Sequence, residues 1–270
     1  MNVLLTAEFV DTPDGRLFIA ARWPGNHSSR RAVVVVPALA DEMNKSRKLV
    51  TELGCALAQN GVATVIPDLI GTGDSEGSFE DASVALWLRN LDEVADWGKR
   101  RGIEIDAILG VRFGCLLAAL WTRTSECRVR ATAFWQPTPN GEQIVRQWIR
   151  LRVSAAMFDG GSKVSSADLE QHLTAGQSLE IGGYLLTNAL AQELRALELS
   201  DLIGPNLGRL HLFEVGEGAQ LTPAIRRLAS VCSSSEPVRV QGAPFWSATE
   251  IVLNPELVTL TLQCLVGEVS

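Results

Sequence analysis

The sequence predicts an α/β fold, in which a mostly parallel, twisted sheet carries helices on both faces. Short β-branched runs alternate with longer stretches of helical periodicity, and this alternation is typical of parallel strands joined by helical crossovers. Residues 32–36 are apolar throughout, which is typical of a strand buried on both faces. The length of 270 residues, 46% of them apolar, suits one large domain with its own core.

The first two elements form an expected hairpin. Residues 3–10 and 16–23 flank the turn Thr-Pro-Asp-Gly, whose glycine supplies the positive φ that such a turn needs. Buried strands are then expected at 32–36 and 62–67, and further strands at 104–109 and 131–135. Helices are expected between them at 46–60, 79–101 and 113–124.

After residue 137 the pattern turns helical until about residue 205. Strands are again expected at 210–215 and 237–240, with helices at 222–231 and 255–266. The simplest organisation is therefore one core formed by residues 1–136 and 206–270. A helical cap insertion at residues 137–205 interrupts it.

Composition excludes several classes of function. A net charge of −7 provides no positive field for nucleic acid. Five scattered cysteines and three histidines form no metal-binding or disulfide pattern, so we expect neither a metal nor a cofactor. The start of the chain has no signal-peptide pattern, and the longest apolar stretch is about half of the ~20 residues that a membrane helix needs. We therefore expect a cytoplasmic protein without an integral membrane segment.

The most informative segment is Gly110-Val-Arg-Phe-Gly114, between an expected strand and an apolar helix. Its spacing is that of the nucleophile elbow G-x-S-x-G of the α/β-hydrolase fold, where larger side chains at the two glycines would collide with strand and helix. Arg112 stands where the nucleophile would be. A guanidinium stays protonated and only donates hydrogen bonds, so Arg112 cannot attack a substrate. Together with the helix N-terminus it could bind an anion, or it could pair with a buried carboxylate.

The other two positions of a catalytic triad can be tested separately. The acid follows a late strand in this fold, and Glu214 is suitably placed for it. The histidine follows the last strand, but residues 241–246 contain none. The three histidines of the chain lie elsewhere: His27, His172 and His211. The sequence thus predicts that Ser-His-acid acyl transfer is absent.

Several segments together resemble one family. They are Pro37-Ala-Leu-Ala-Asp-Glu-Met-Asn-Lys-Ser-Arg47, residues 68–77, the Arg-centred elbow at 110–114, Trp135-Gln-Pro-Thr, Gly182-Gly-Tyr184 and Gly242-Ala-Pro-Phe-Trp246. In these segments, which extend over nearly the whole chain, the sequence is similar to the second of the two α/β-hydrolase-like families associated with the exosortase-A system. The resemblance implies an α/β-hydrolase fold and partners from a bacterial exopolysaccharide or protein-sorting locus. It also implies that the arginine and the missing histidine belong to the family pattern.

The loop after the strand at 32–36 is expected to face the elbow. Ala38 and Leu39 occupy the place of the second oxyanion donor, opposite the N–H of Phe113. Glu42 and Asn44 could meet Arg112 across the pocket floor, because ligands in such sheets bind at the carboxyl ends of strands. Alternatively, Asn44 or Ser46 caps the following helix. The glycine-rich loop at 68–77 lacks a Gly-Lys-Ser/Thr ending, so we expect it to be structural.

Aromatic residues are expected to give this pocket an apolar mouth: Trp148, Phe245 and Trp246. A set of arginines in the insertion is expected to form a solvated face: Arg146, Arg150 and Arg152. If these arginines turn inward instead, they would extend the cationic corner, and an amphiphilic acid would suit it.

Three functions remain open. The first is a protein without Ser-His-Asp catalysis that binds a small anionic or acyl ligand at Arg112. The second is a hydrolase in which Glu42 or Glu214 activates water on an ester or thioester, while Arg112 stabilises negative charge. The third is an interaction module of a polysaccharide or protein-sorting assembly.

Overall fold

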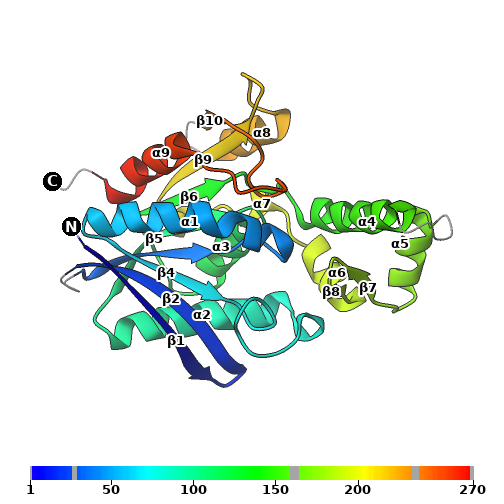
Figure 1. Cartoon of the computed structure of the whole chain (residues 1–270), viewed down its shortest axis with the longest axis horizontal. Helices are drawn as coiled ribbons and strands as arrows, with labels where there is room; N and C mark the ends of the chain where they lie inside the picture. The colour runs from blue at the N-terminus through cyan, green and yellow to red at the C-terminus, as the bar shows by residue number, and fades with distance from the viewer. Residues whose placement is uncertain (1, 26–28, 159–163, 233–236, 268–270) are drawn as a thin grey trace.

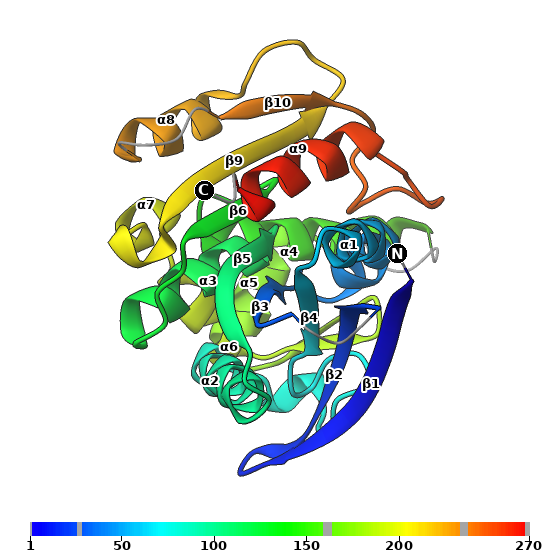
Figure 2. The ribbon, with the colours of Figure 1, turned by 90° about the vertical axis from the view of Figure 1, so that its left-hand side faces the viewer.

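A computed structural model describes residues 2–25, 29–158, 164–232 and 237–267. Eight strands form one sheet in the order β1-β2-β4-β3-β5-β6-β9-β10 (Figures 1 and 2). They are β1 (Val3–Thr12), β2 (Gly15–Pro24), β3 (Arg31–Val36), β4 (Ala63–Asp68), β5 (Glu104–Val111), β6 (Ala131–Trp135), β9 (Arg209–Gly216) and β10 (Val238–Gln241). Strand β2 is antiparallel to both of its neighbours, and the six strands from β4 to β10 are parallel. The predicted α/β class, with its antiparallel hairpin, is confirmed.

Helices cover both faces of the sheet, as Figure 2 shows. Val33 and Val35 of β3 pack in the cluster that includes α1 (Asp41–Gln59) and α9 (Pro255–Val266). Val34 and Val36 point to the opposite face, which is covered by three helices: α2 (Val84–Arg100), α3 (Phe113–Thr124) and α8 (Pro223–Val231). Apolar residues from Ala32 to Val36 are therefore required, because neither face of this part of β3 meets water.

The chain between β6 and β9 extends from the carboxyl-end edge of the sheet (Figure 1). It contains α4 (Gly141–Phe158), α5 (Ser166–Thr174), β7 (Leu179–Ile181), β8 (Tyr184–Leu186), α6 (Asn188–Arg195), α7 (Leu199–Leu202) and the 3₁₀ turn η2 (Pro205–Leu207). The sequence predicts helices here, but β7 and β8 form a hairpin. Strands of three residues are too short for a periodic signal, and two glycines with positive φ, Gly182 and Gly183, form their turn.

Two helix starts differ from the prediction. Helix α1 begins at Asp41 rather than residue 46, because Ala40 turns the chain with a φ of 54° and no side chain caps the helix. The predicted cap by Asn44 or Ser46 is therefore wrong; the Ser46 hydroxyl donates instead to the Glu42 carbonyl at 2.6 Å. The stretch 79–101 is a 3₁₀ turn, η1 (Phe79–Asp81), followed by α2, which Ser83 caps by accepting from the Leu86 N–H.

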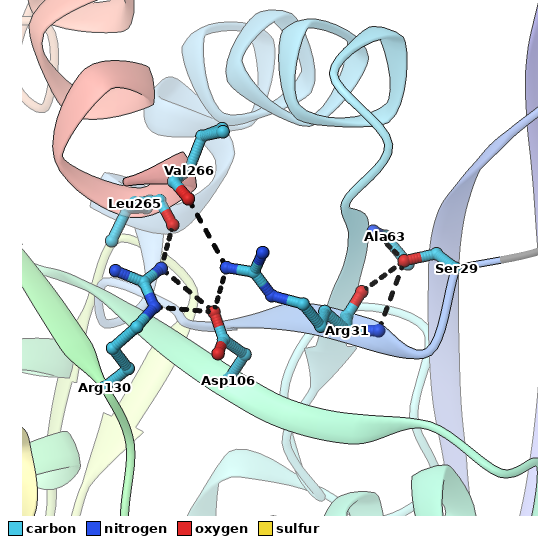
Figure 3. A network of polar contacts seen from close by, with 7 residues as sticks. All are labelled: Ser29, Arg31, Ala63, Asp106, Arg130, Leu265 and Val266. Carbon is cyan, nitrogen blue, oxygen red and sulfur yellow. Dashed lines mark hydrogen bonds and ion pairs between the residues drawn. The ribbon is translucent and has the colours of Figure 1, made fainter. Parts of the chain in front are cut away.

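At the amino-end edge of the sheet, one carboxylate joins three elements (Figure 3). Asp106 in β5 accepts from Arg31 at 2.8 Å and from Arg130, just before β6, at 3.0 Å. The same two guanidiniums donate to carbonyls at the C-terminal end of α9, Arg130 to Leu265 and Arg31 to Val266. Because carbonyls at a helix C-terminus lack partners within the helix, this network stabilises the docking of α9.

The described helices include none that combines the length and the apolar character needed to cross a membrane.

Candidate functional site

The predicted elbow is confirmed at the junction of β5 and α3. Arg112 has a φ of 55°, a conformation that side chains rarely adopt. A Cβ added to Gly114 would lie 2.1 Å from the carbonyl oxygen of Val36, and one added to Gly110 would lie 2.9 Å from the Cα of Cys115. Both glycines are therefore required by the close approach of the neighbouring backbone.

Strained backbone gathers around this turn. Among the described residues, the non-glycine positions with positive φ are Ala40, Arg112 and Gln136. These residues follow β3, β5 and β6, three adjacent strands inside the sheet, at their carboxyl ends. Each such conformation costs about 1–3 kcal/mol and usually marks a functional site. The backbone strain and the elbow therefore both place the candidate site at the carboxyl-end edge of the sheet.

Glu42 holds the Arg112 side chain in place from across the elbow. The Arg112 Nε lies 3.2 Å from Glu42 Oε2, and Nη2 lies 3.1 Å from Oε1, so the pair is bidentate. Gln147 of α4 closes a ring: its amide donates to Glu42 Oε1 at 3.0 Å and accepts from Arg112 Nη2 at 3.3 Å. The side chains of Arg112 and Glu42 are only 11% and 17% exposed. The sequence did not single out Gln147.

The remaining contacts of Arg112 define what it can still bind. Its Nη1 lies 3.4 Å from the Gln136 carbonyl oxygen, and its guanidinium carbon lies 4.8 Å from the centre of the Trp246 ring. A guanidinium has five N–H donors. Four hydrogen bonds join it to described residues, so one N–H on Nη1 stays available.

A cavity of about 700 Å³ opens beside this arginine, and we call it the Arg112 cavity. The ends of β5, β6 and β9 supply its floor through Arg112, Gln136 and Glu214. Helix α4, helix α8, the segments before them and the loop between β10 and α9 supply the walls: Pro137, Thr138, Pro139, Gln143, Arg146, Gln147, Arg150, Thr222, Ala224, Ile225, Trp246 and Ser247. This size is within the range of small-molecule sites.

Glu214 lies where the acid of a triad is expected. It is 1% exposed, and its Oε2 accepts from the Thr222 N–H at 2.8 Å and pairs with Arg239 at 3.1 Å. The carboxylate thus joins the end of β9 to the start of α8 and to β10. In contrast to Glu42, only one of its oxygens takes part in contacts between described residues.

The predicted apolar mouth is only partly correct. Trp246 lines the Arg112 cavity. Trp148 packs on Phe79, with ring centres 5.6 Å apart, and Phe245 is buried against Trp135. Both residues are anchored in the core because the adjacent position, Gln147 or Trp246, faces the cavity instead.

Asn44 does not reach Arg112 in the structure. Its side-chain oxygen accepts from Arg47 Nε at 3.3 Å, and Asn44 lines a second, more open cavity beside Tyr184. Three further predicted residues, Ala38, Leu39 and Phe113, are at most 4% exposed at the ends of β3 and β5. Their side chains belong to the core, so only their backbone groups could meet a ligand.

The α4 arginines agree only in part with the expected solvated face. Arg146 and Arg150 are exposed, but they also line the Arg112 cavity, together with Gln143 and Gln147. These four positions recur at helical spacing and share one face of α4. This spacing is the feature of the sequence that could have shown that they share a face. Arg152 does not line this cavity.

Among the described residues, no imidazole lines the Arg112 cavity. His211 lies within β9, where burial lowers its pKa, and His172 is exposed on α5. His27 lies outside the described residues. The glycine-rich loop after β4 is held by Asp68, whose Oδ2 accepts from the Asp74 N–H at 2.9 Å, as expected for a structural loop.

Comparison with known proteins identifies the fold. No family model matches the sequence, and neither does any curated protein. Among solved structures, Est1E from Butyrivibrio proteoclasticus with bound ferulic acid is 18% identical, with a TM-score of 0.69 over 95% of this chain and 96% of that one. A proline iminopeptidase from Mycobacterium smegmatis is 14% identical, with a TM-score of 0.62 over 96% and 97% of the chains. A thioesterase domain from the curacin biosynthetic pathway is 11% identical, with a TM-score of 0.57 over 96% and 99%.

Proposed function

We propose that this α/β-hydrolase fold binds a small anionic or acyl ligand in the Arg112 cavity and carries out no Ser-His-acid acyl transfer. One observation carries the proposal: an arginine with a mostly buried side chain stands at the centre of the elbow and borders a cavity of small-molecule size. A side chain that only donates hydrogen bonds cannot form an acyl-enzyme.

The elbow retains the donors that favour an acidic or carbonyl oxygen. One N–H of Arg112 is available, and the N–H groups of Phe113 and Gly114 open α3 ahead of its first turn, whereas that of Cys115 donates to the Arg112 carbonyl. Because Glu42 balances the charge of Arg112, the arginine offers a ligand a directed hydrogen-bond donor but no net positive charge. Prolines, Ile225 and the Trp246 ring supply apolar wall for the body of a ligand.

Calorimetric titration and thermal-shift measurements with monocarboxylates, acyl thioesters and sugar phosphates test the proposal. The variant is R112Q/E42Q, which removes both charges of the pair and so leaves no unpaired buried ion. We expect a stabilising acid or acyl compound for the wild type, with binding weakened at least tenfold in the variant. R152Q, on the same helix but away from the cavity, is the matched control and should bind as the wild type does.

Two results would contradict this proposal. The first is that no compound binds the wild type more tightly than it binds R112Q/E42Q. The second is turnover of an ester or thioester that is lost in E214Q, since it would establish the hydrolytic alternative with Glu214 as base. Glu42 is the weaker candidate for that role, because both of its oxygens already accept hydrogen bonds.

The biological setting of the ligand belongs to the same proposal. The sequence resemblance to the exosortase-associated family supports a role beside exopolysaccharide or protein-sorting genes, with partners from such a locus. Affinity purification from the native host, compared between the wild type and R112Q/E42Q, would reveal whether partner capture depends on the cavity.

A further inference from the structure

Resting on the proposed function, we infer that the ligand is a small carboxylic acid with a single negative charge, held by Arg150, and that a second polar group of the ligand hydrogen-bonds Thr138. The charged contact to the ligand thus lies on α4 rather than at the elbow, and the ligand has one charge and two polar ends. The observations behind it are the ion pairing around the Arg112 cavity and a buried hydroxyl without a partner.

Nearly every charge around the cavity is balanced within the protein. Arg112 pairs with Glu42, and Glu214 pairs with Arg239. Arg146 pairs with Glu142 at 2.6 Å, and Glu142 shares Arg195 with Glu170. Each of these groups has equal numbers of cations and anions, so none of them leaves a net charge for a ligand.

Arg150 is the exception among the cavity-lining residues that the structure describes. It is exposed on α4, and no described carboxylate pairs with it. The cavity therefore has one uncompensated positive charge, which a ligand with one negative charge would balance. A phosphate monoester carries about −1.5 to −2 charges at pH 7 and would need a further cation. A carboxylate matches both the charge and the planar, bidentate geometry of a guanidinium.

Thr138 supplies the second contact. It is 4% exposed, it lines the cavity, and its Oγ1 has no hydrogen-bond partner. A buried polar group without a partner is unfavourable, whereas a ligand oxygen or N–H would satisfy it. The loop that carries Thr138 is fixed in place, since the Leu199 N–H donates to the Pro139 carbonyl at 2.8 Å. The backbone beside this hydroxyl is therefore fixed.

The test uses calorimetric titration of the whole protein with ω-hydroxy carboxylic acids of increasing chain length. Each acid is compared with the unsubstituted acid, the primary amide of the same length, the dicarboxylate and the alkyl phosphate. For the wild type we expect an ω-hydroxy acid of one length to bind most tightly. Its neutral amide should bind at least tenfold more weakly.

Two variants separate the two contacts. R150Q should weaken binding of the acid at least tenfold while leaving binding of the amide unchanged, and R152Q should leave both unchanged. T138V should abolish the preference for the hydroxylated acid over the unsubstituted one. Because valine replaces an unsatisfied hydroxyl, T138V should not lower the thermal midpoint of the free protein, which guards against a folding artefact.

Each outcome supports or overturns the inference. Equal affinity for acid and amide would overturn it, as would tighter binding of the dicarboxylate or the alkyl phosphate. If acids bind and R112Q/E42Q weakens them but R150Q does not, the proposed function stands and this inference fails. If no anionic or acyl compound of the wider panel binds the wild type, both fail together.

Discussion

At the scale of single residues, the mostly buried pair of Arg112 and Glu42 dominates the site. Two ions with most of their surface removed from water are stable only when both are paired and hydrogen-bonded. Gln147 completes this requirement by donating to one partner and accepting from the other. The pair therefore links three elements, α1, the elbow and α4, and the loss of either partner alone would leave the other charge uncompensated.

The first stability prediction follows from this pairing. We expect E42Q alone and R112Q alone each to lower the free energy of unfolding by about 3 kcal/mol, because each leaves one buried ion without its partner. The double variant R112Q/E42Q should recover most of that loss. Urea denaturation of the four proteins measures the cycle. If the double variant loses as much stability as the two single variants added together, the pair is not coupled.

The sequence predicted part of this residue arrangement. Arg112 at the elbow and the contact with Glu42 could be inferred, because the positions of the elbow and of the loop after β3 are fixed by the fold. Gln147 could not, since its place depends on how α4 packs over the sheet. Asn44 was expected at Arg112 because the helix was predicted to begin only at residue 46. Since α1 begins at Asp41, Glu42 and Asn44 are two positions apart on a helix and face different directions.

At the scale of elements, the sheet and most helix starts were predictable, but the starts of α1 and α2 were not. Strands such as β3 are apolar on both faces, which leaves a strong signal in the sequence. Helix α1 starts from the backbone conformation of Ala40, which has no sequence signature of the usual capping kind. The hairpin of β7 and β8 likewise leaves no periodic pattern in the sequence, since its strands have three residues each.

The stabilisation that docks α9 onto the sheet should depend on pH. Burial opposes ionisation of Asp106, but hydrogen bonds and charge from Arg31 and Arg130 outweigh it and lower its pKa below 3.8. Because the folded pKa is the lower one, the stabilisation is full above the unfolded value and is lost as pH falls through the folded value. D106N should lower the free energy of unfolding by about 2 kcal/mol at pH 7.

Urea denaturation of the wild type and D106N from pH 7 to pH 3 measures this effect. The difference in stability between them should shrink below about pH 3.9, as Asp106 takes up a proton. D96N, which removes an exposed pair with Lys99, should leave the stability unchanged. A difference that stays constant down to pH 3 would contradict a role for the ionised carboxylate.

At the scale of the whole molecule, the elbow is part of the central core. Cys115 is fully buried one turn beyond Arg112, in contact distance of the Gly110 backbone, and burial raises the pKa of its thiol. Neither a reagent nor a hydroxide ion can reach it without displacing β5 or α3. Its reactivity should therefore report on unfolding of the entire domain rather than on local opening.

Thiol labelling at pH 8 with peptide mapping tests this expectation. Cys115 should remain unmodified in the folded protein and should react in proportion to the population that urea denaturation identifies as unfolded. Cys127, whose pKa is raised to about 11, is only partly buried and should react slowly but without unfolding. Labelling of Cys115 faster than global unfolding would reveal a local opening at the elbow.

The stacking of Trp246 on Arg112 has an optical consequence. The chain has seven tryptophans, and six of them are buried: Trp23, Trp87, Trp97, Trp121, Trp135 and Trp148. Trp246 alone is partly exposed, and it lines the cavity. A neutral collisional quencher such as acrylamide will therefore quench mainly the fluorescence of Trp246, and a ligand bound against this indole will reduce the quenching. Acrylamide quenching of the unlabelled protein thus measures the fraction of Arg112 cavities that hold a ligand.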